Sequence, residues 1–455
     1  MFRAVTSKPL NPLWGSLAVL LIIVVFSFLR LRFYGDPALS IAGNDTISYV
    51  ESSQASLFSA DIWTGRRLLT TNLIYKIFEP ESGYEIRVNG SLETTKRIYQ
   101  PGFDRIVILQ MALSILGWGL LAWLFSEHLY SLWAKIASAV LILSFAFTPQ
   151  MADWDSILLS ESLTFSLFAL QFALLLKMAF VLYKDPDASI TGWALAWALA
   201  SFFWTFLRDT NMFTSVMTVS LIAMLMIAPR YRKNKTLKGI VIFQLLVIVL
   251  AFFTARSSAR ALDQIDNLYI DDIFPNPALV AIFQEMGMPV DSYLDPAFHP
   301  WLQEHGSNTM IRFMLAHPGY VAQKLARDFA PAFTEIKQTY FNARDLNPMR
   351  EYLFGLGNAL HPENTTPFLA SLLALVGIVL LAFRNTANSR VWAWLVVWLF
   401  LSASLTLIPT ILGDTWALNR HALYSTVIYR LGMWLFPLIL VDLAWQRDSQ
   451  ATPLS

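Results

Sequence analysis

The segment RYRKNKTLKGIVIFQLLVIVLAFFTA, residues 230–255, joins a basic cluster to an uninterrupted apolar run. The run from 239 to 255 carries no charge and approaches the roughly 20 apolar residues that a helix needs to cross a bilayer. No acid stands among the basic residues before it, and Lys and Arg collect on the cytoplasmic side of membrane proteins. The segment therefore predicts a membrane-spanning helix that begins at the cytoplasmic face.

Similar apolar runs recur along the whole chain. They lie near residues 13–31, 105–125, 132–148, 157–182, 190–207, 211–229, 239–255, 367–383, 391–412 and 426–445. We therefore expect an all-α polytopic membrane protein of about ten transmembrane helices, forming a single integral-membrane domain over residues 1–455. The first run follows Arg3 and Lys8 and has no small-residue cleavage site after it, so we interpret it as an uncleaved signal anchor.

The composition suits a chain whose solvent is mostly lipid. Of the 455 residues, 56% are hydrophobic and only 14% are charged. The formal net charge of +1 argues against nucleic acid as a partner, because binding to phosphate backbones needs a surplus of Lys and Arg. The chain has no cysteine, which excludes a disulfide framework, thiolate zinc sites and cysteine catalysis.

The basic turn at 230–238 sets the expected orientation. Ten spans threaded through a cytoplasmic turn at this position place both termini in the cytoplasm and residues 35–104 and 256–366 outside. Both outer segments hold more acids than bases, which agrees with this orientation. Short cytoplasmic turns then fall at 126–131, 183–188 and 384–390. The expected location is a bacterial plasma (inner) membrane, with the active site on the extracytoplasmic side.

The two outer loops contain patterns of interfacial helices. Residues 68–78 have helical spacing, and one face of this segment carries Leu69, Leu73 and Ile77. Such a helix can lie in the membrane interface, with Trp63 and Tyr75 at the depth of the headgroups. The second loop holds another amphipathic stretch at 308–333, interrupted by Pro318.

Charged residues gather in four places that this topology brings to the outer face. They are Asp45 in GNDTISYVE, Asp153 and Asp155 in QMADWDSILLSES, Arg208 and Asp209 in LRDTN, and Asp414, Arg420, His421 and Arg430 in GDTWALNRHALYSTVIYR. Ionisable groups at membrane depth are costly and usually face a polar cavity. The four clusters therefore predict one hydrated cleft on the outer side.

The acids of these clusters have two interpretations each. Asp45 is either a catalytic carboxylate that removes a proton from an acceptor or a helix N-cap within Asn-Asp-Thr. Asp153 and Asp155 either hold a divalent cation, Mg²⁺ or Mn²⁺, against a phosphate or form a helix start. Glu161 follows one to two turns later and could support either role of the pair.

The basic residues of the outer face are candidates for binding a phosphate. Arg420 and Arg430 are the first choices, because a guanidinium fits phosphate oxygens and stays charged when partly buried. His421, Arg208 and Arg66 are further candidates for donor binding. The alternatives are snorkelling for Arg430, a structural role for His421 and headgroup anchoring for Arg66.

Together these clusters resemble the GT-C superfamily, the membrane glycosyltransferases that use polyprenyl-phosphate-linked sugars, including the protein O-mannosyltransferase and aminoarabinose transferase-like group. The resemblance rests on Asp45 shortly after the first span, on the long first loop with interfacial helices, and on DWDSILLSESL before the fourth span. It extends to AHPGYVAQKLARDF in a late outer loop and to NRHALYSTVIYR. Thr46 stands where the O-mannosyltransferases pair Asp with Glu, and the WWD-type motif of oligosaccharyltransferases is missing.

The resemblance implies a transferase that moves a sugar from a polyprenyl-phosphate donor to a glycan, lipid or protein acceptor outside. It makes Asp45 the general base and places Arg420 and Arg430 on the donor phosphate. The alternatives are a transporter or flippase with the same charges along its path, a glycan polymerase or ligase, and a structural envelope protein without chemistry.

Overall fold

The computed structural model describes residues 12–37, 40–86, 100, 102–258, 260–334, 336, 349–384 and 388–451. Within these residues the chain is helical apart from its connecting loops and an isolated parallel pairing between Ile41 and Ile157. The predicted all-α class is confirmed. Arg3 and Lys8 lie outside the described residues, as do the two chain ends.

Each of the ten predicted apolar runs forms a helix. These helices are α1 (Pro12–Tyr34), α5 (Asp104–Glu127), α6 (Leu132–Phe147), α8 (Glu161–Lys184), α9 (Thr191–Thr205), α10 (Met212–Ile227), α11 (Lys235–Arg256), α18 (Thr366–Phe383), α19 (Ser389–Gly413) and α21 (Leu423–Ala451). In the described part of the chain, eight are long and apolar enough to cross a membrane. A ninth span results if α6 is counted with the residues that follow it after a 59° bend. Helix α9, with 15 residues, is shorter than a full span.

Helix α8 occupies the centre of the bundle. In its most apolar stretch 78% of the residues are buried inside the protein, against 17% for the peripheral α1. Its closest neighbour is α5, which approaches it at Gly117: a Cβ at this position would lie 2.4 Å from the carbonyl oxygen of Ser166. The absence of a side chain at Gly117 therefore lets the two backbones touch.

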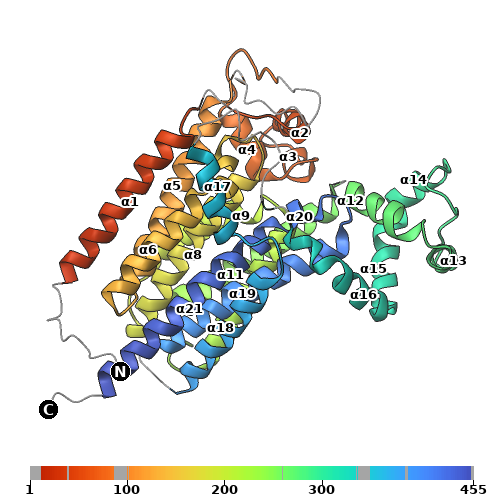
Figure 1. Cartoon of the computed structure of the whole chain (residues 1–455). Coiled ribbons are helices and arrows are strands. Elements are labelled where there is room, and N and C mark those ends of the chain that lie inside the picture. The colour runs from red at the N-terminus through yellow and green to blue at the C-terminus, as the bar shows by residue number, and fades with distance from the viewer. Residues whose placement is uncertain are drawn as a thin grey trace.

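The turns predicted to be cytoplasmic meet at one end of the bundle. Arg230 donates to the carbonyl oxygen of Tyr183, and Asn234 donates to that of Pro186 at 2.8 Å. Arg390, in the first turn of α19, lines the same cavity as Arg230. The first turn of α1 and the last turns of α21 lie at this end as well (Figure 1).

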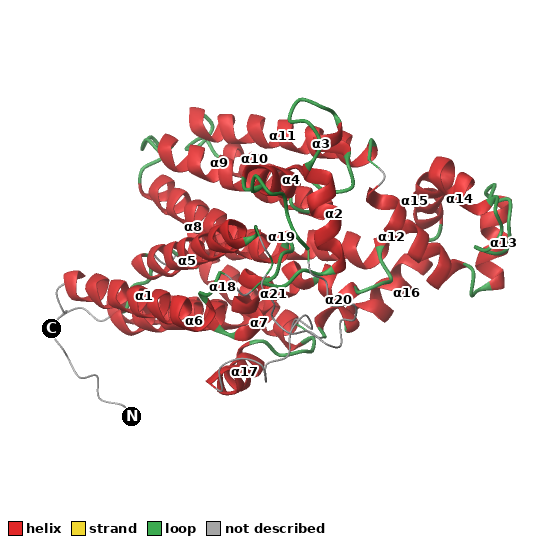
Figure 2. Cartoon of the chain, turned by 90° about the horizontal axis from the view of Figure 1, so that it is seen from above, coloured by secondary structure: helices red, strands yellow, loops and turns green. Residues whose placement is uncertain are grey.

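Shorter helices lie away from this end (Figure 1). They are α2 (Asn44–Ser53), α3 (Asp61–Thr64), α4 (Leu69–Ile77), α12 (Arg260–Leu268), η4 (Tyr269–Ile273), α13 (Pro277–Glu285), α14 (Phe298–Trp301), η5 (Leu302–Gly306), α15 (Ser307–Ala316), α16 (Pro318–Phe329), η6 (Pro331–Phe333), α17 (Met349–Leu360) and α20 (Leu418–His421). Figure 2 shows α12–α16 set to one side of the bundle. They pack on a hydrophobic core of their own, built around Tyr269, Phe283 and Phe313.

The predicted loop helices form, with one correction. Helix α4 covers the expected segment, and α15 and α16 are separated at His317, before Pro318. Tyr75 does not face the lipid headgroups: it is buried inside the protein, and its hydroxyl donates to the carbonyl oxygen of Leu158 at 3.0 Å. A tyrosine hydroxyl that finds a protein acceptor can be buried, and here it ties α4 to the bundle.

Candidate active site

Asp45 lies in the first turn of α2 but does not cap it. The N-cap residue is Gly43, whose backbone N–H donates to the side-chain oxygen of Thr46 at 3.0 Å. The Asp45 carboxylate therefore turns away from the end of its own helix and toward neighbouring elements. This geometry removes the capping alternative for Asp45.

A backbone pairing fixes α2 against the start of α8. The N–H of Ile41 donates to Ser156 and the N–H of Leu158 donates to Ile41, both at 2.9 Å. The Thr46 hydroxyl donates to the carbonyl oxygen of Leu158 at 3.0 Å. These bonds hold the extended residues just before Glu161, so Asp45 and Glu161 come close together although they are far apart in sequence.

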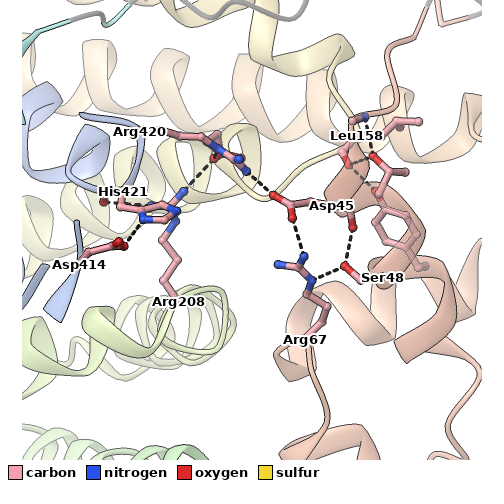
Figure 3. A network of polar contacts seen from close by, with 12 residues as sticks. Asp45, Ser48, Arg67, Leu158, Arg208, Asp414, Arg420 and His421 are labelled. Carbon is pink, nitrogen blue, oxygen red and sulfur yellow. Dashed lines mark hydrogen bonds and ion pairs between the residues drawn. The ribbon is translucent and has the colours of Figure 1, made fainter. Parts of the chain in front are cut away.

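Five ionised residues form an arginine–carboxylate cluster, which consists of Asp45, Arg67, Glu161, Arg208 and Arg420 (Figure 3). Arg67 and Arg420 bind separate oxygens of Asp45, at 2.8 and 2.9 Å. Arg420 also binds Glu161 at 2.9 Å, and Arg208 reaches the same Glu161 oxygen at 2.9 Å. The cluster thus joins five segments of the chain. They are α2, the turn before α4, the start of α8, α20, and the residue that precedes η3 (Asp209–Asn211).

The cluster is partly open to the surface and rich in positive charge. The Glu161 side chain is only 1% exposed, whereas that of Asp45 is 36% exposed. Burial would raise the pKa of Asp45, but the charges and hydrogen bonds of Arg420 and Arg67 outweigh it, so the pKa lies below its ordinary value. Three guanidinium groups face two carboxylates here, which leaves positive charge for an anionic ligand.

His421 and Asp414 extend the cluster. Arg208 donates to the backbone carbonyl of His421 at 3.1 Å, and the His421 ring bonds to the Asp414 carboxylate (Figure 3). Asp414 also accepts from the N–H of Trp416 at 3.1 Å, which shapes the turn between α19 and α20. The structure therefore brings the predicted residues Asp45, Arg208, Arg420 and His421 together.

Arg430 lies elsewhere, and its expected place on a phosphate is not supported by its surroundings. Its side chain is fully buried within α21. The guanidinium donates to the carbonyl oxygen of Pro362 at 3.1 Å, to the Thr426 hydroxyl at 2.7 Å and to the carbonyl oxygen of Phe333 at 2.5 Å. Phe333 and Pro362 both belong to the segment 256–366, so these bonds tie that segment to the last helix.

Arg66 also stays outside the cluster. Its side chain is 66% exposed and lies 3.5 Å from the carboxylate of Asp263 on α12. Its neighbour Arg67 instead points inward to Asp45 and lies over the ring of Tyr49, with its guanidinium carbon 4.5 Å from the ring centre. Of two adjacent arginines, the one not chosen from the sequence joins the site.

Asp153 and Asp155, the acids proposed for a cation, are both buried, and Asp155 is engaged by other side chains. Asp155 is buried and paired with Arg30 from α1 at 2.7 Å, and it accepts from the Ser162 hydroxyl at 2.7 Å. A carboxylate held by a guanidinium has little capacity left for Mg²⁺ or Mn²⁺. Among the described residues, no group of three His, Asp or Glu side chains is placed to hold a metal.

Glu161 is the central acid of the site, whereas only a supporting role was predicted for it from the sequence. Its carboxylate binds two arginines and lies in the first turn of α8, where the helix dipole favours a negative charge. The available signal was an isolated acid at the start of an apolar run. Its arginine partners come from distant segments, so the sequence alone could not identify them.

Fold and site define a polytopic helical membrane protein with a charged cluster at one end of its bundle. No protein-family model matches the chain, and no curated protein matches it. A solved structure with some similarity is the archaeal oligosaccharyltransferase AglB from Archaeoglobus fulgidus, in complex with an inhibitory peptide and a dolichol-phosphate. The match covers 96% of this chain with 11% sequence identity and a TM-score of 0.45, and the chain spans about half (52%) of that protein.

Proposed function

We propose that the chain is a membrane glycosyltransferase that moves a sugar from a polyprenyl-phosphate donor to an extracytoplasmic glycan, lipid or protein acceptor. The observation that supports this function is the cluster itself, in which a partly exposed carboxylate shares Arg420 with a buried one. A transferase of this class needs a base for the acceptor and fixed cations for the leaving phosphate. Candidates for both roles lie within one set of contacts.

In the proposed step, an acceptor hydroxyl attacks the anomeric carbon of the donor sugar while the bond from that carbon to the phosphate oxygen breaks. The hydroxyl proton passes to Asp45, and polyprenyl phosphate leaves with the bonding electrons. Arg420 and Arg208 stabilise the charge that develops on the leaving phosphate. Glu161 holds these two guanidinium groups in place before the donor arrives.

Donor binding also prepares the base. In the free protein both oxygens of Asp45 are bound by arginines, which lowers its pKa and makes it a weak proton acceptor. When the phosphate of the sugar donor binds Arg420, it competes with Asp45 for the N–H groups of this guanidinium. As Arg420 turns to the phosphate, the pKa of Asp45 rises toward its ordinary value, so the base becomes stronger once the substrate is bound.

The first outer loop offers a path for the lipid tail of the donor. Ile47 of α2, Leu57 and Phe58 are exposed apolar residues, and the Phe58 side chain is fully exposed. Exposed apolar side chains at a membrane interface can contact lipid rather than water. We propose that the polyprenyl chain enters sideways between helices along this loop, which delivers its phosphate to Arg420.

The decisive experiment replaces Asp45 by Asn, which keeps the size of the side chain but cannot accept a proton at neutral pH. Turnover with a synthetic polyprenyl-phosphate sugar should fall by roughly two to four orders of magnitude. Donor affinity should not fall, because the substitution leaves Arg420 and Arg208 in place. The matched control is Asp61→Asn, an exposed acid on α3 in the same loop, which should transfer at the wild-type rate.

An Asp45→Asn protein with wild-type turnover would remove Asp45 from the mechanism. If wild-type protein in vesicles moves the intact lipid-linked sugar across the membrane without transferring it, the transporter or flippase interpretation takes its place. The proposed transfer step does not involve Mg²⁺ or Mn²⁺, because Arg30 already binds Asp155.

A further inference from the structure

A cavity lies at the end of the bundle away from the arginine–carboxylate cluster, among the turns predicted to be cytoplasmic. It has a volume of about 320 Å³ and is lined by residues of α8, α10, α11 and α19. Its wall is mainly apolar and includes Leu175, Leu182, Ile222, Leu225 and Ile240. The volume falls at the lower end of the range of about 300–1,000 Å³ that is typical of ligand sites.

Two arginines lie at this otherwise apolar cavity. Arg230 and Arg390 both line it, and both are exposed. The guanidinium carbon of Arg230 lies over the rings of Tyr183 and Tyr231, 5.6 and 5.5 Å from their centres. No acid is among the lining residues, so the positive charge has no carboxylate beside it in the cavity. An apolar cavity with cations and tyrosines suits a molecule with an apolar chain and an anionic head.

Trp394 supplies an independent observation. It lines the cavity from α19, and its indole N–H is buried. Among the residues that the structure describes, none accepts a hydrogen bond from this N–H. A buried donor without an acceptor is costly, and buried Trp normally finds a partner. A ligand with a carbonyl or phosphate oxygen would satisfy it.

We propose that this cavity binds one anionic phospholipid, with an acyl chain between α8 and α19 and the phosphate on Arg230 and Arg390. An ester oxygen of the lipid accepts from Trp394. Arg230 and Arg390, with no acid among the described lining residues, favour an anionic rather than a zwitterionic head. The site is separate from the arginine–carboxylate cluster and does not depend on the transferase function.

The test measures lipid binding to the full-length protein by native mass spectrometry in detergent. The protein is titrated with phosphatidylglycerol and with phosphatidylcholine of identical acyl chains. A single site should bind phosphatidylglycerol at least tenfold more tightly. Glycerol 3-phosphate, which carries the same phosphate without a chain, should not displace the lipid, because chain burial contributes most of the binding.

Variants locate the site. Arg230→Ala with Arg390→Ala should abolish the preference, whereas Arg230→Lys with Arg390→Lys should retain most of it. The matched control, Arg232→Ala with Lys233→Ala, removes two charges from the same turn and should keep the preference. Equal binding of both lipids to the wild type would overturn the proposal, as would displacement by glycerol 3-phosphate. Equal loss in the two alanine pairs would also overturn it, because it would reduce the effect to general surface charge.

Discussion

Arg420 and Arg430 are ten positions apart, yet their surroundings assign them to different tasks. Arg420 is partly exposed and binds two carboxylates that a ligand can replace. Arg430 is fully buried and donates mainly to backbone carbonyls. A ligand could reach this guanidinium only if the loops that carry these carbonyls unfolded. The type of charge alone therefore does not define a phosphate site. The N–H groups of the guanidinium must also be accessible to a ligand.

This difference predicts that substitution of Arg430 mainly affects stability, whereas substitution of Arg420 mainly affects donor binding. Arg430→Ala should lower the free energy of unfolding by about 3 kcal/mol, because it leaves buried acceptors without donors. Arg420→Ala should weaken donor binding by roughly tenfold to a hundredfold, the effect of losing one charge-assisted hydrogen bond or a little more. Thermal unfolding in detergent and donor titration measure the two effects.

Arg66→Ala is the control for both arginine variants, since an exposed pair contributes little to stability. An Arg430→Ala protein that unfolds like the wild type but fails to bind donor would contradict the structural role assigned here.

The sequence predicted four ionisable residues of the site but missed Arg67, and it did not show which residues meet. Asp45, Arg208, Arg420 and His421 were found because polar residues next to apolar runs are conspicuous. The pairing of Asp155 with Arg30 was missed, because Arg30 lies at the end of the first run and its partner is set by how α1 packs. Such contacts depend on tertiary geometry that local patterns do not encode.

At the scale of elements, apolar runs predicted every long helix but not the path of the connection between α6 and α8. This connection contains α7 (Pro149–Ala152) and η2 (Asp153–Ser156), followed by the extended residues that pair with Ile41. That path is fixed by hydrogen bonds to residues before α2. A partner so distant in sequence leaves no local signal.

The contact between α5 and α8 can be tested at Gly117. A Gly117→Ala side chain would come within 2.4 Å of the Ser166 carbonyl, so the helices must separate. We expect a loss of about 1–3 kcal/mol in unfolding free energy, as for overpacked cores, and slower transfer because α8 carries Glu161. Thermal unfolding and the transfer assay measure this.

Gly239→Ala in α11 is the matched control, since nothing lies within 4 Å of its Cβ position. It should be neutral or slightly stabilising, because Ala favours helix more than Gly does. Equal destabilisation by both changes would show that helix propensity, not close packing, governs Gly117.

At the scale of the whole molecule, the bundle has two ends, each of which defines a face. The turns predicted to be cytoplasmic lie at one end, and the arginine–carboxylate cluster lies at the other. Basic residues at 230–238 should hold their face in the cytoplasm. A reporter fused after Thr236 should therefore be active inside, and reporters within 40–100 or 260–360 should be active outside. An outside signal at Thr236 would invert the map and move the proposed site to the cytoplasmic side.

Helices α12–α16 show what the whole-chain pattern could not predict. Their amphipathic spacing was visible, but not that they share a separate hydrophobic core. Two contacts join this part of the chain to the turn before α20: Lys324 to the carbonyl oxygen of Asp414 at 3.4 Å and Thr415 to Asp271 at 2.8 Å. Asp414 is also the partner of His421, so it contacts both α16 and the candidate site.

The ion pair between Asp45 and Arg420 joins residues 375 positions apart, which has a consequence for biosynthesis. At a synthesis rate of about 5–20 residues per second, Arg420 is made roughly 20 to 75 s after Asp45. Arg67, only 22 positions after Asp45, is made within seconds. During that interval Arg67 is the partner available to the carboxylate, while the nascent protein still lacks the cation assigned to the phosphate. On the proposed function, the protein would thus stay inactive until Arg420 has left the ribosome.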